Sequence, residues 1–243
     1  YKRQEFWFAK NGGDIKSQEQ KTLKKETEYL SIRSGITLDV AGVTSQNYQY
    51  YSKFNLNFAG EKLALFKTEE VLFLRAEGAL RGWSMSGEAK TLYEQAINLS
   101  FEQYGASGAD TYIADATSQP QAYTDPTGSY SAGQTSSITI AWQDGSSNDE
   151  ANLERIITQK WIAMFPCTVE AWSEYRRTGY PKLLPVVVNN SGGVIDDSKE
   201  KIRRLWYPPT EYSENKANIL EAINMLGGAD NGATRLWWDK KPR

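Results

Sequence analysis

Residues 153–182 constrain the fold more than any other stretch, because they read as a helix, a short break and a second helix. Five apolar residues recur at helical spacing and predict one buried face, with the large rings in the core: Leu153, Ile156, Ile157, Trp161 and Met164. Pro166 removes a backbone donor and ends the first helix. Thr168 is placed to cap the second helix, which Gly179 closes.

A second helix pair is predicted over residues 68–105. Its second helix spaces Ala89, Tyr93 and Ala96 as the second helix of a tetratricopeptide repeat does, and small residues at these positions let two helices approach closely. One pair cannot bury its apolar faces alone, so the pairs must stack on each other. We therefore predict a mainly α fold: tetratricopeptide-like helix pairs in an α–α superhelix, with long irregular loops and a few short strands.

The rest of the chain divides by composition into segments around these pairs. The predicted organisation is irregular chain with short strands over 1–67, the helix pair 68–105, a loop insertion over 106–149, the helix pair 150–179, and a C-terminal excursion with a last helix over 180–243. Within the excursion, residues 186–188 are a possible strand, and Ser213 is placed to cap the last helix.

Composition excludes several classes of function. The formal net charge is −2, which gives no field that favours nucleic acid, and no apolar run approaches the roughly 20 residues that span a bilayer. The sequence contains no histidine, so the usual general base and the commonest metal ligand are both missing. Cys167 is the single cysteine, which rules out an internal disulfide, and we expect it to be a small buried residue.

No sequence motif positively indicates catalysis or metal binding. Phosphate loops and nucleophile elbows are missing, and a pair of carboxylates suited to glycoside cleavage can always be found among 30 acidic residues. Residues 144–150 carry oxygen ligands of the kind calcium prefers, but their spacing does not fit a calcium loop, and a helix cap explains them as well. We expect no cofactor and no enzymatic activity.

Aromatic residues on polar loops are the candidate ligand-binding groups. A sugar offers an apolar C–H face to a flat ring and hydroxyls to fixed polar groups, and loops on a helical scaffold can present both. The candidates are rings flanked by amides and carboxylates, together with one ring near the N-terminus: Trp142, Tyr123, Tyr130, Tyr48, Tyr50 and Trp7. Each ring has the alternative role of anchoring its own loop.

Four ordered blocks resemble the C-terminal half of SusD/RagB-type proteins. They are ITQKWIA at 157–163, EAWSEYRRTGYP at 170–181, RRLWYPPTE at 203–211 and LWWD at 236–239. The resemblance covers residues 51 to the end and is loose before them. It is closest to the branch of the family named after the starch-utilisation protein SusD. Apart from the resemblance, the rings and arginines of these blocks suit core packing and ion pairing.

The resemblance implies a lipoprotein on the outer face of the bacterial outer membrane. Such a protein captures oligosaccharides and delivers them to a SusC-type TonB-dependent transporter, and the lipid anchor at its N-terminus is expected to lie outside this sequence. Two alternatives stay open: a helical-repeat lid or scaffold that binds peptides or protein partners, and peptide uptake as implied for RagB-like members. An uncharacterised hydrolase is a third, weaker hypothesis.

Overall fold

The computed structural model describes residues 32–36, 65–125, 128–198 and 201–240. The described elements are α3 (Thr68–Leu80), α4 (Ala89–Gln103), α5 (Ala109–Ile113), the 3-10 turn η2 (Ser146–Asn148), α6 (Asp149–Ala163), α7 (Thr168–Thr178), α8 (Pro209–Glu214) and α9 (Lys216–Leu226). The predicted mainly α architecture is confirmed, since in this part of the chain the only β pairing is an isolated bridge between Tyr123 and Ala132.

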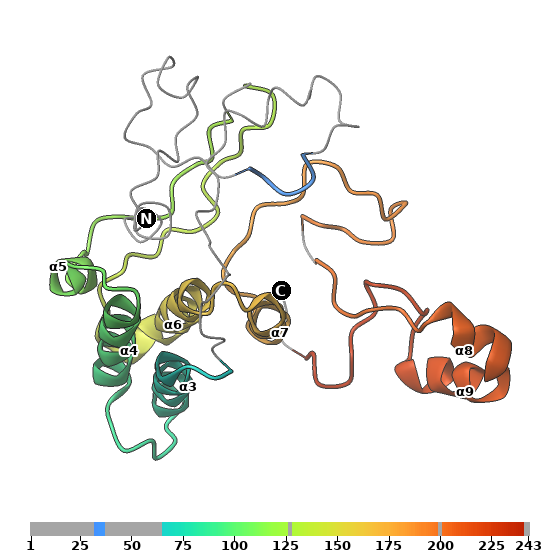
Figure 1. Ribbon diagram of the computed structural model, residues 1–243, viewed down its shortest axis with the longest axis horizontal. Helices are drawn as coiled ribbons and strands as arrows, with labels where there is room; N and C mark the ends of the chain where they lie inside the picture. The colour runs from blue at the N-terminus through green and yellow to red at the C-terminus, as the bar shows by residue number, and fades with distance from the viewer. Residues whose placement is uncertain (1–31, 37–64, 126–127, 199–200, 241–243) are drawn as a thin grey trace.

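Helices α3 and α4 form an antiparallel pair, and α6 packs against both of them (Figure 1). The core lies at their junction, where Phe73, Tyr93 and Ile156 are fully buried. Ala76 and Ala96 are buried beside them, and their small side chains allow the helices to approach closely, as the spacing predicted. α7 packs on the other side of α6, which makes α6 the central helix.

α6 is buried on nearly all sides, and its polar residues are buried with partners. Asn152 exchanges hydrogen bonds with the backbone of Gln143, and Arg155 Nε donates to the carbonyl of Thr139 at 3.1 Å. Tyr112 on α5 donates its hydroxyl to the Gln159 side chain at 3.0 Å. Burying these groups unpaired would be costly, so the pairing orders the insertion against the helix.

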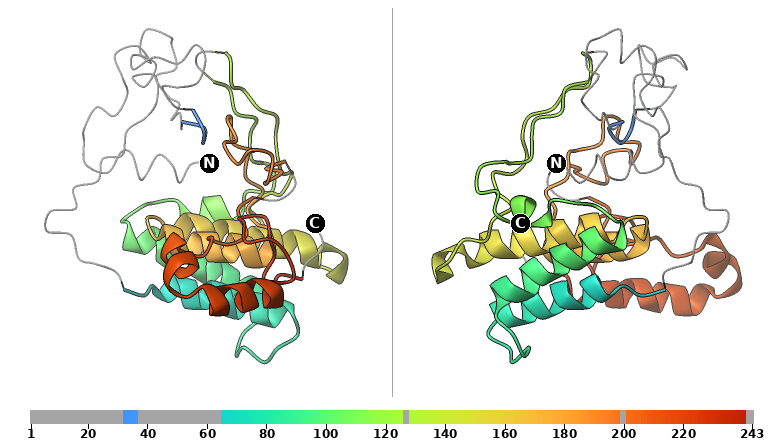
Figure 2. Two further views of the ribbon diagram at one scale, coloured as in Figure 1. Left: turned by 90° about the vertical axis from the view of Figure 1, so that its right-hand side faces the viewer. Right: turned by 60° about the vertical axis from the view of Figure 1, so that its left-hand side comes forward.

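Several local predictions differ from the structure. Residues 186–188 form no strand: Val187 instead donates one backbone hydrogen bond to Ser34, and Arg33 donates to the carbonyl of Pro185. Ser213 lies inside α8 and donates to Thr210, so it does not cap the last helix, which begins after Asn215. The C-terminal segment from residue 203 carries α8 and α9 as a lobe that projects from the helical body (Figures 1 and 2).

Candidate functional site

The insertion forms a ribbon of two extended segments that run side by side away from the helices (Figures 1 and 2). Tyr123 and Ala132 exchange two backbone hydrogen bonds of 2.8 and 2.9 Å, which hold the segments together. Ser136 donates its hydroxyl to Glu154 on α6 at 2.5 Å, so one segment is fixed to the central helix. This ribbon is therefore a rigid wall of the kind that positions loop residues for binding.

The predicted ring residues of the insertion do not form one cluster. Trp142 lies at the base of the ribbon, half buried against Tyr93 of the helical core with a centroid distance of 5.6 Å. Tyr130 belongs to a separate small cluster with Ile36 and Val187. Tyr123 is also half buried, on the paired part of the ribbon.

The three remaining predicted rings, Tyr48, Tyr50 and Trp7, lie outside the described residues. Their role as ligand contacts stays a prediction.

A cavity of about 650 Å³ lies between the ribbon, α6, α7 and the excursion that follows α7. Its walls are mainly apolar, and its two largest rings come from the helices: Trp161 on α6 and Trp172 on α7. Trp161 is 40% exposed, so the prediction that it fills the core is wrong. The sequence pattern predicts that both rings serve core packing, so it gives no signal that they line a cavity.

The position of Trp161 follows from helix geometry. At about 100° per residue, Trp161 lies roughly 80° around α6 from Leu153, at the edge of the apolar stripe. Lys160 occupies the middle of that stripe and is buried. Trp161 thus shares its face with Glu154 and Thr158, and all three line the cavity.

Trp172 is fixed by two contacts, and its cation partner also lies over Trp238. Its indole nitrogen donates to the carbonyl of Ile202 at 3.2 Å. The guanidinium of Arg176 lies 3.9 Å from the centre of its ring and 5.5 Å from the centre of the Trp238 ring. Cation–π contacts of this kind hold a ring in a set orientation. One wall of the cavity therefore presents an oriented indole.

Polar groups occupy the rim of the cavity. Lys182 Nζ lies 3.2 Å from Glu154 Oε2, and Lys201 Nζ lies 3.0 Å from Asp197 Oδ2. The hydroxyl of Thr158 is buried in the wall and has no hydrogen-bond partner within the described part of the protein. A few fixed polar groups in mainly apolar walls are typical of a small-molecule site.

Cys167 also lines the cavity and is exposed, which corrects the prediction that it is buried. It lies at the N-terminal boundary of α7, between Pro166 and Thr168, and not in the core.

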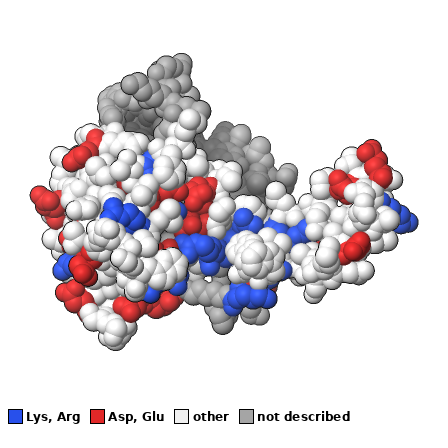
Figure 3. Space-filling model, turned by 90° about the horizontal axis from the view of Figure 1, so that it is seen from below, with Lys and Arg blue, Asp and Glu red and all other residues white. Residues whose placement is uncertain are grey.

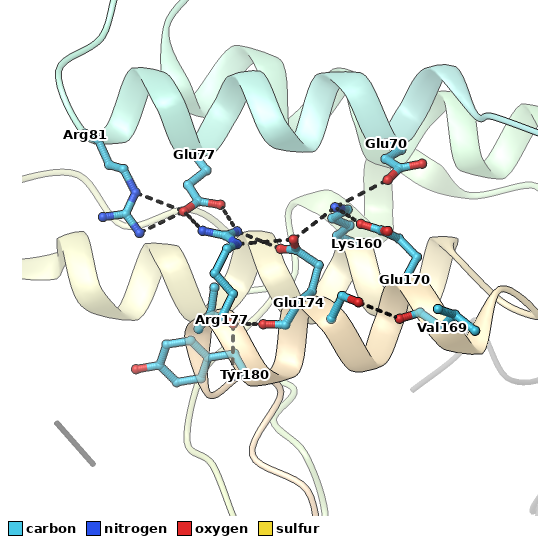
Figure 4. Close-up of polar contacts among 11 residues, drawn as sticks. Glu70, Glu77, Arg81, Lys160, Val169, Glu170, Glu174, Arg177 and Tyr180 are labelled. Carbon is cyan, nitrogen blue, oxygen red and sulfur yellow. Dashed lines mark hydrogen bonds and ion pairs between the residues drawn. The ribbon is translucent and has the colours of Figure 1, made fainter. Parts of the chain in front are cut away.

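A partly buried ionic network joins α3, α6 and α7 (Figure 4). Lys160 Nζ lies 3.5 Å from Glu70, 3.2 Å from Glu170 and 3.5 Å from Glu174. Arg177 continues the row between Glu174 and Glu77, which also pairs with Arg81. All members of the network have opposite charges as partners, so its function is to hold the three helices together.

The segment 144–150 forms η2 and the first turn of α6, with Asp149 and Glu150 at the positive end of the helix. In the described part of the chain, no group of three acidic, cysteine or histidine residues could hold a metal ion. None of the described helices is long and apolar enough to cross a membrane.

Comparison with known proteins now identifies the family. The model of the SusD-like family, described as Susd and RagB outer membrane lipoprotein, matches residues 11–239. The chain belongs to the SusD-like family. This membership agrees with the expected outer-membrane localisation. None of the curated proteins matches the chain.

Solved structures of SusD homologues share the fold. One from Bacteroides thetaiotaomicron is 47% identical with a TM-score of 0.81, over 88% of this chain and 46% of that one. A chitin-binding SusD homologue from Flavobacterium johnsoniae is 42% identical with a TM-score of 0.80, over 93% of this chain and 45% of that one. A SusD homologue from Bacteroides uniformis is 47% identical with a TM-score of 0.75, over 80% of this chain and 40% of that one. This SusD-like chain therefore spans less than half the length of these relatives.

Proposed function

We propose that this SusD-like protein binds oligosaccharides at the cell surface and that the cavity beside Trp161 is a binding site. The observation that carries the proposal is a 650 Å³ cavity with two indoles and an unpartnered buried hydroxyl. The family and the chitin-binding homologue, 42% identical, support a glycan as the ligand.

Binding in this cavity depends on complementary surfaces. Trp161 and Trp172 offer flat apolar faces to the C–H face of a sugar ring, while Thr158 and the ion pair of Glu154 with Lys182 offer polar partners for hydroxyls. Each contact is modest, so affinity grows over several sugar units. The protein binds its ligand without cleaving it, and it passes the ligand to a SusC-type TonB-dependent transporter.

The ribbon supplies further contacts in this proposal. Its residues Pro120, Thr135 and Ile138 line the cavity. Tyr123 and Tyr130 do not line it and are proposed as separate contacts for a longer ligand. Trp142 contributes through its exposed side, while its other contacts anchor the ribbon to Tyr93.

A panel of disaccharides and their hexamers tests the proposal by isothermal titration calorimetry. The panel contains chitobiose, cellobiose, maltose, xylobiose and mannobiose. We expect Trp161→Ala to weaken binding of the best ligand about tenfold, since a stacked ring contributes on the order of 1.4 kcal/mol. Trp83→Ala is the matched control, because Trp83 is 63% exposed and lines no described cavity. If no saccharide binds, or if Trp161→Ala binds as the native protein does, the proposal is wrong.

The mainly apolar walls favour one second candidate, an apolar peptide. Thr158→Val separates the two ligands because it replaces the hydroxyl with a methyl group of similar shape. A saccharide that uses the hydroxyl should bind more weakly to this variant. An apolar peptide should bind equally well or better.

A further inference from the structure

A second cavity, of about 600 Å³, lies in the projecting C-terminal lobe and shares no lining residue with the first. α9 forms one wall with Ala222, Met225 and Leu226. The turn that follows the lobe forms the opposite wall, and Tyr207 closes one side.

The two indoles of the LWWD block have different environments. Trp238 is half buried beside Arg176, and Asp239 is buried in an ion pair with Arg203, so these residues tie the C-terminal segment to α7. Trp237 is 82% exposed and lines the second cavity. The prediction that the whole block packs onto the body is therefore wrong for Trp237. An indole left in water contributes little to the fold, and Trp237, unlike the exposed Trp83, lines a cavity with donors around it.

The side wall of this cavity is held rigidly. Tyr207 donates its backbone N–H to Asp230 at 3.2 Å, and the guanidinium of Arg204 lies 4.6 Å from the centre of its ring. Arg204 is itself paired with Asp230, and both side chains are largely buried. Tyr207 is therefore the fixed part of this site, and a fixed side chain loses little entropy when a ligand binds.

Polar and apolar groups share the walls of the second cavity in comparable amounts, whereas the first cavity is mainly apolar. Arg235 and Lys240 supply donors beside the exposed indole. Figure 3 shows Lys and Arg side chains gathered on the surface between the helical body and the lobe. An open ring flanked by donors matches the apolar C–H face and the hydroxyl rim of a sugar.

We propose that Trp237, with Met225, Tyr207, Arg235 and Lys240 around it, is a second saccharide site that binds one pyranose unit or a short oligosaccharide. The C–H face of the sugar lies on the indole of Trp237, and its hydroxyls accept hydrogen bonds from Arg235 and Lys240. This inference rests on the proposed function, since the ligand is of the same class as that of the first cavity. A long glycan that reaches both cavities binds more tightly than a disaccharide because the second contact is intramolecular.

Calorimetry with each disaccharide that binds tests the inference. The native protein should bind two disaccharides. Trp161→Ala should weaken one of the two sites about tenfold, Trp237→Ala should weaken the other about tenfold, and Trp83→Ala should change neither. With Trp161→Ala and Trp237→Ala combined, both sites should be weakened. If one hexamer reaches both cavities, Trp237→Ala should also weaken hexamer binding.

Lys240→Glu provides a second variant, because its side chain is exposed and its change should leave the melting temperature unaltered. It should weaken binding at the second site alone. If disaccharides bind but Trp237→Ala and Lys240→Glu keep the native stoichiometry and affinity, the second site is wrong while the proposed function stands. If no saccharide binds the native protein at all, the proposed function fails, and this inference fails with it.

Discussion

Arg177 on α7 and Glu77 on α3, 100 residues apart in the sequence, form a two-pronged ion pair with N–O distances of 2.6 and 2.5 Å. Figure 4 shows this pair in the row of charges between the two helices. The fork geometry fixes the relative rotation of α3 and α7 as well as their separation. Because α7 carries Trp172, this ion pair helps to set one wall of the first cavity.

Glu77→Gln removes the charge that Arg177 and Arg81 share. We expect a loss of about 2 kcal/mol in the free energy of unfolding, because the Glu77 carboxylate is buried and its charge is the shared acceptor of both guanidinium groups. Urea unfolding measures the loss. Arg81→Ala is the control: its side chain is partly exposed, so we expect a loss of about 0.5 kcal/mol. If the two variants lose equal stability, the ion pair of Glu77 with Arg177 does not have the stabilising role assigned to it.

The stabilisation from Glu77 should depend on pH. Burial opposes ionisation of this carboxyl, but hydrogen bonds and charge from Arg177 and Arg81 outweigh burial, so its pKa is lowered. Unfolded chains therefore take up the proton at higher pH than the folded protein does, and stability falls as the pH falls through the lowered pKa. The difference in unfolding free energy between the native protein and Glu77→Gln should shrink from about pH 7 toward about pH 3.

Glu70 should change the stability with pH in the opposite direction to Glu77, so it serves as the comparison. Burial raises the pKa of Glu70 more than Lys160 lowers it. The folded protein holds this proton to higher pH than the unfolded chain, so the stability linked to it is lost as the pH rises through the raised pKa. Urea unfolding at each pH should show the native protein losing stability relative to Glu70→Gln as the pH rises. Parallel curves for Glu70→Gln and Glu77→Gln would contradict both assignments.

The ion pair of Arg203 with Asp239 tethers the C-terminal segment, with Arg203 Nε 2.6 Å from Asp239 Oδ2 and both side chains buried. Asp239→Asn leaves a buried guanidinium without its counter-charge, so we expect a loss of about 3 kcal/mol. Limited proteolysis should cut the segment after residue 226 faster in this variant. Arg235→Met is the control, since Arg235 reaches Asp239 only at 3.5 Å. Unchanged proteolysis of Asp239→Asn would show that the tether lies elsewhere.

Trp142→Ala should affect the fold more than Trp237→Ala does. Trp142 packs against Tyr93, whose hydroxyl donates to the carbonyl of Ile140 in the ribbon. We expect a loss of about 2 kcal/mol for Trp142→Ala and less than about 0.5 kcal/mol for the exposed Trp237. Thermal unfolding of both variants makes the comparison. A larger loss for Trp237→Ala would mean that its ring packs on the body after all.

Local periodicity predicted the helix pairs because Phe73, Ala76, Tyr93 and Ala96 are apolar residues on regular stripes. It could not place Trp161, because the middle of its stripe holds Lys160, whose three acidic partners come from α3 and α7. Burial of a lysine depends on such long-range partners and leaves no local pattern.

The burial of the candidate ligand-binding rings also depends on long-range contacts that leave no local pattern. Trp142 sits in a polar sequence context, yet its ring packs on Tyr93 from a distant helix. Trp237 and Trp238 are neighbours with the same local context, and only the fold decides that Trp238 lies beside Arg176. The sequence indicates which kinds of residue suit sugar binding, but the tertiary contacts decide which rings are available.

Cys167 provides the most direct test of where the ligand binds, because it is the only cysteine, is exposed and lines the first cavity. The measurement is the rate at which a thiol reagent labels Cys167 with and without a saturating saccharide. If the sugar occupies the cavity beside Trp161, labelling should slow several-fold, and Trp161→Ala should lose this protection at the same ligand concentration. An unchanged labelling rate while calorimetry shows saturation would contradict binding in this cavity.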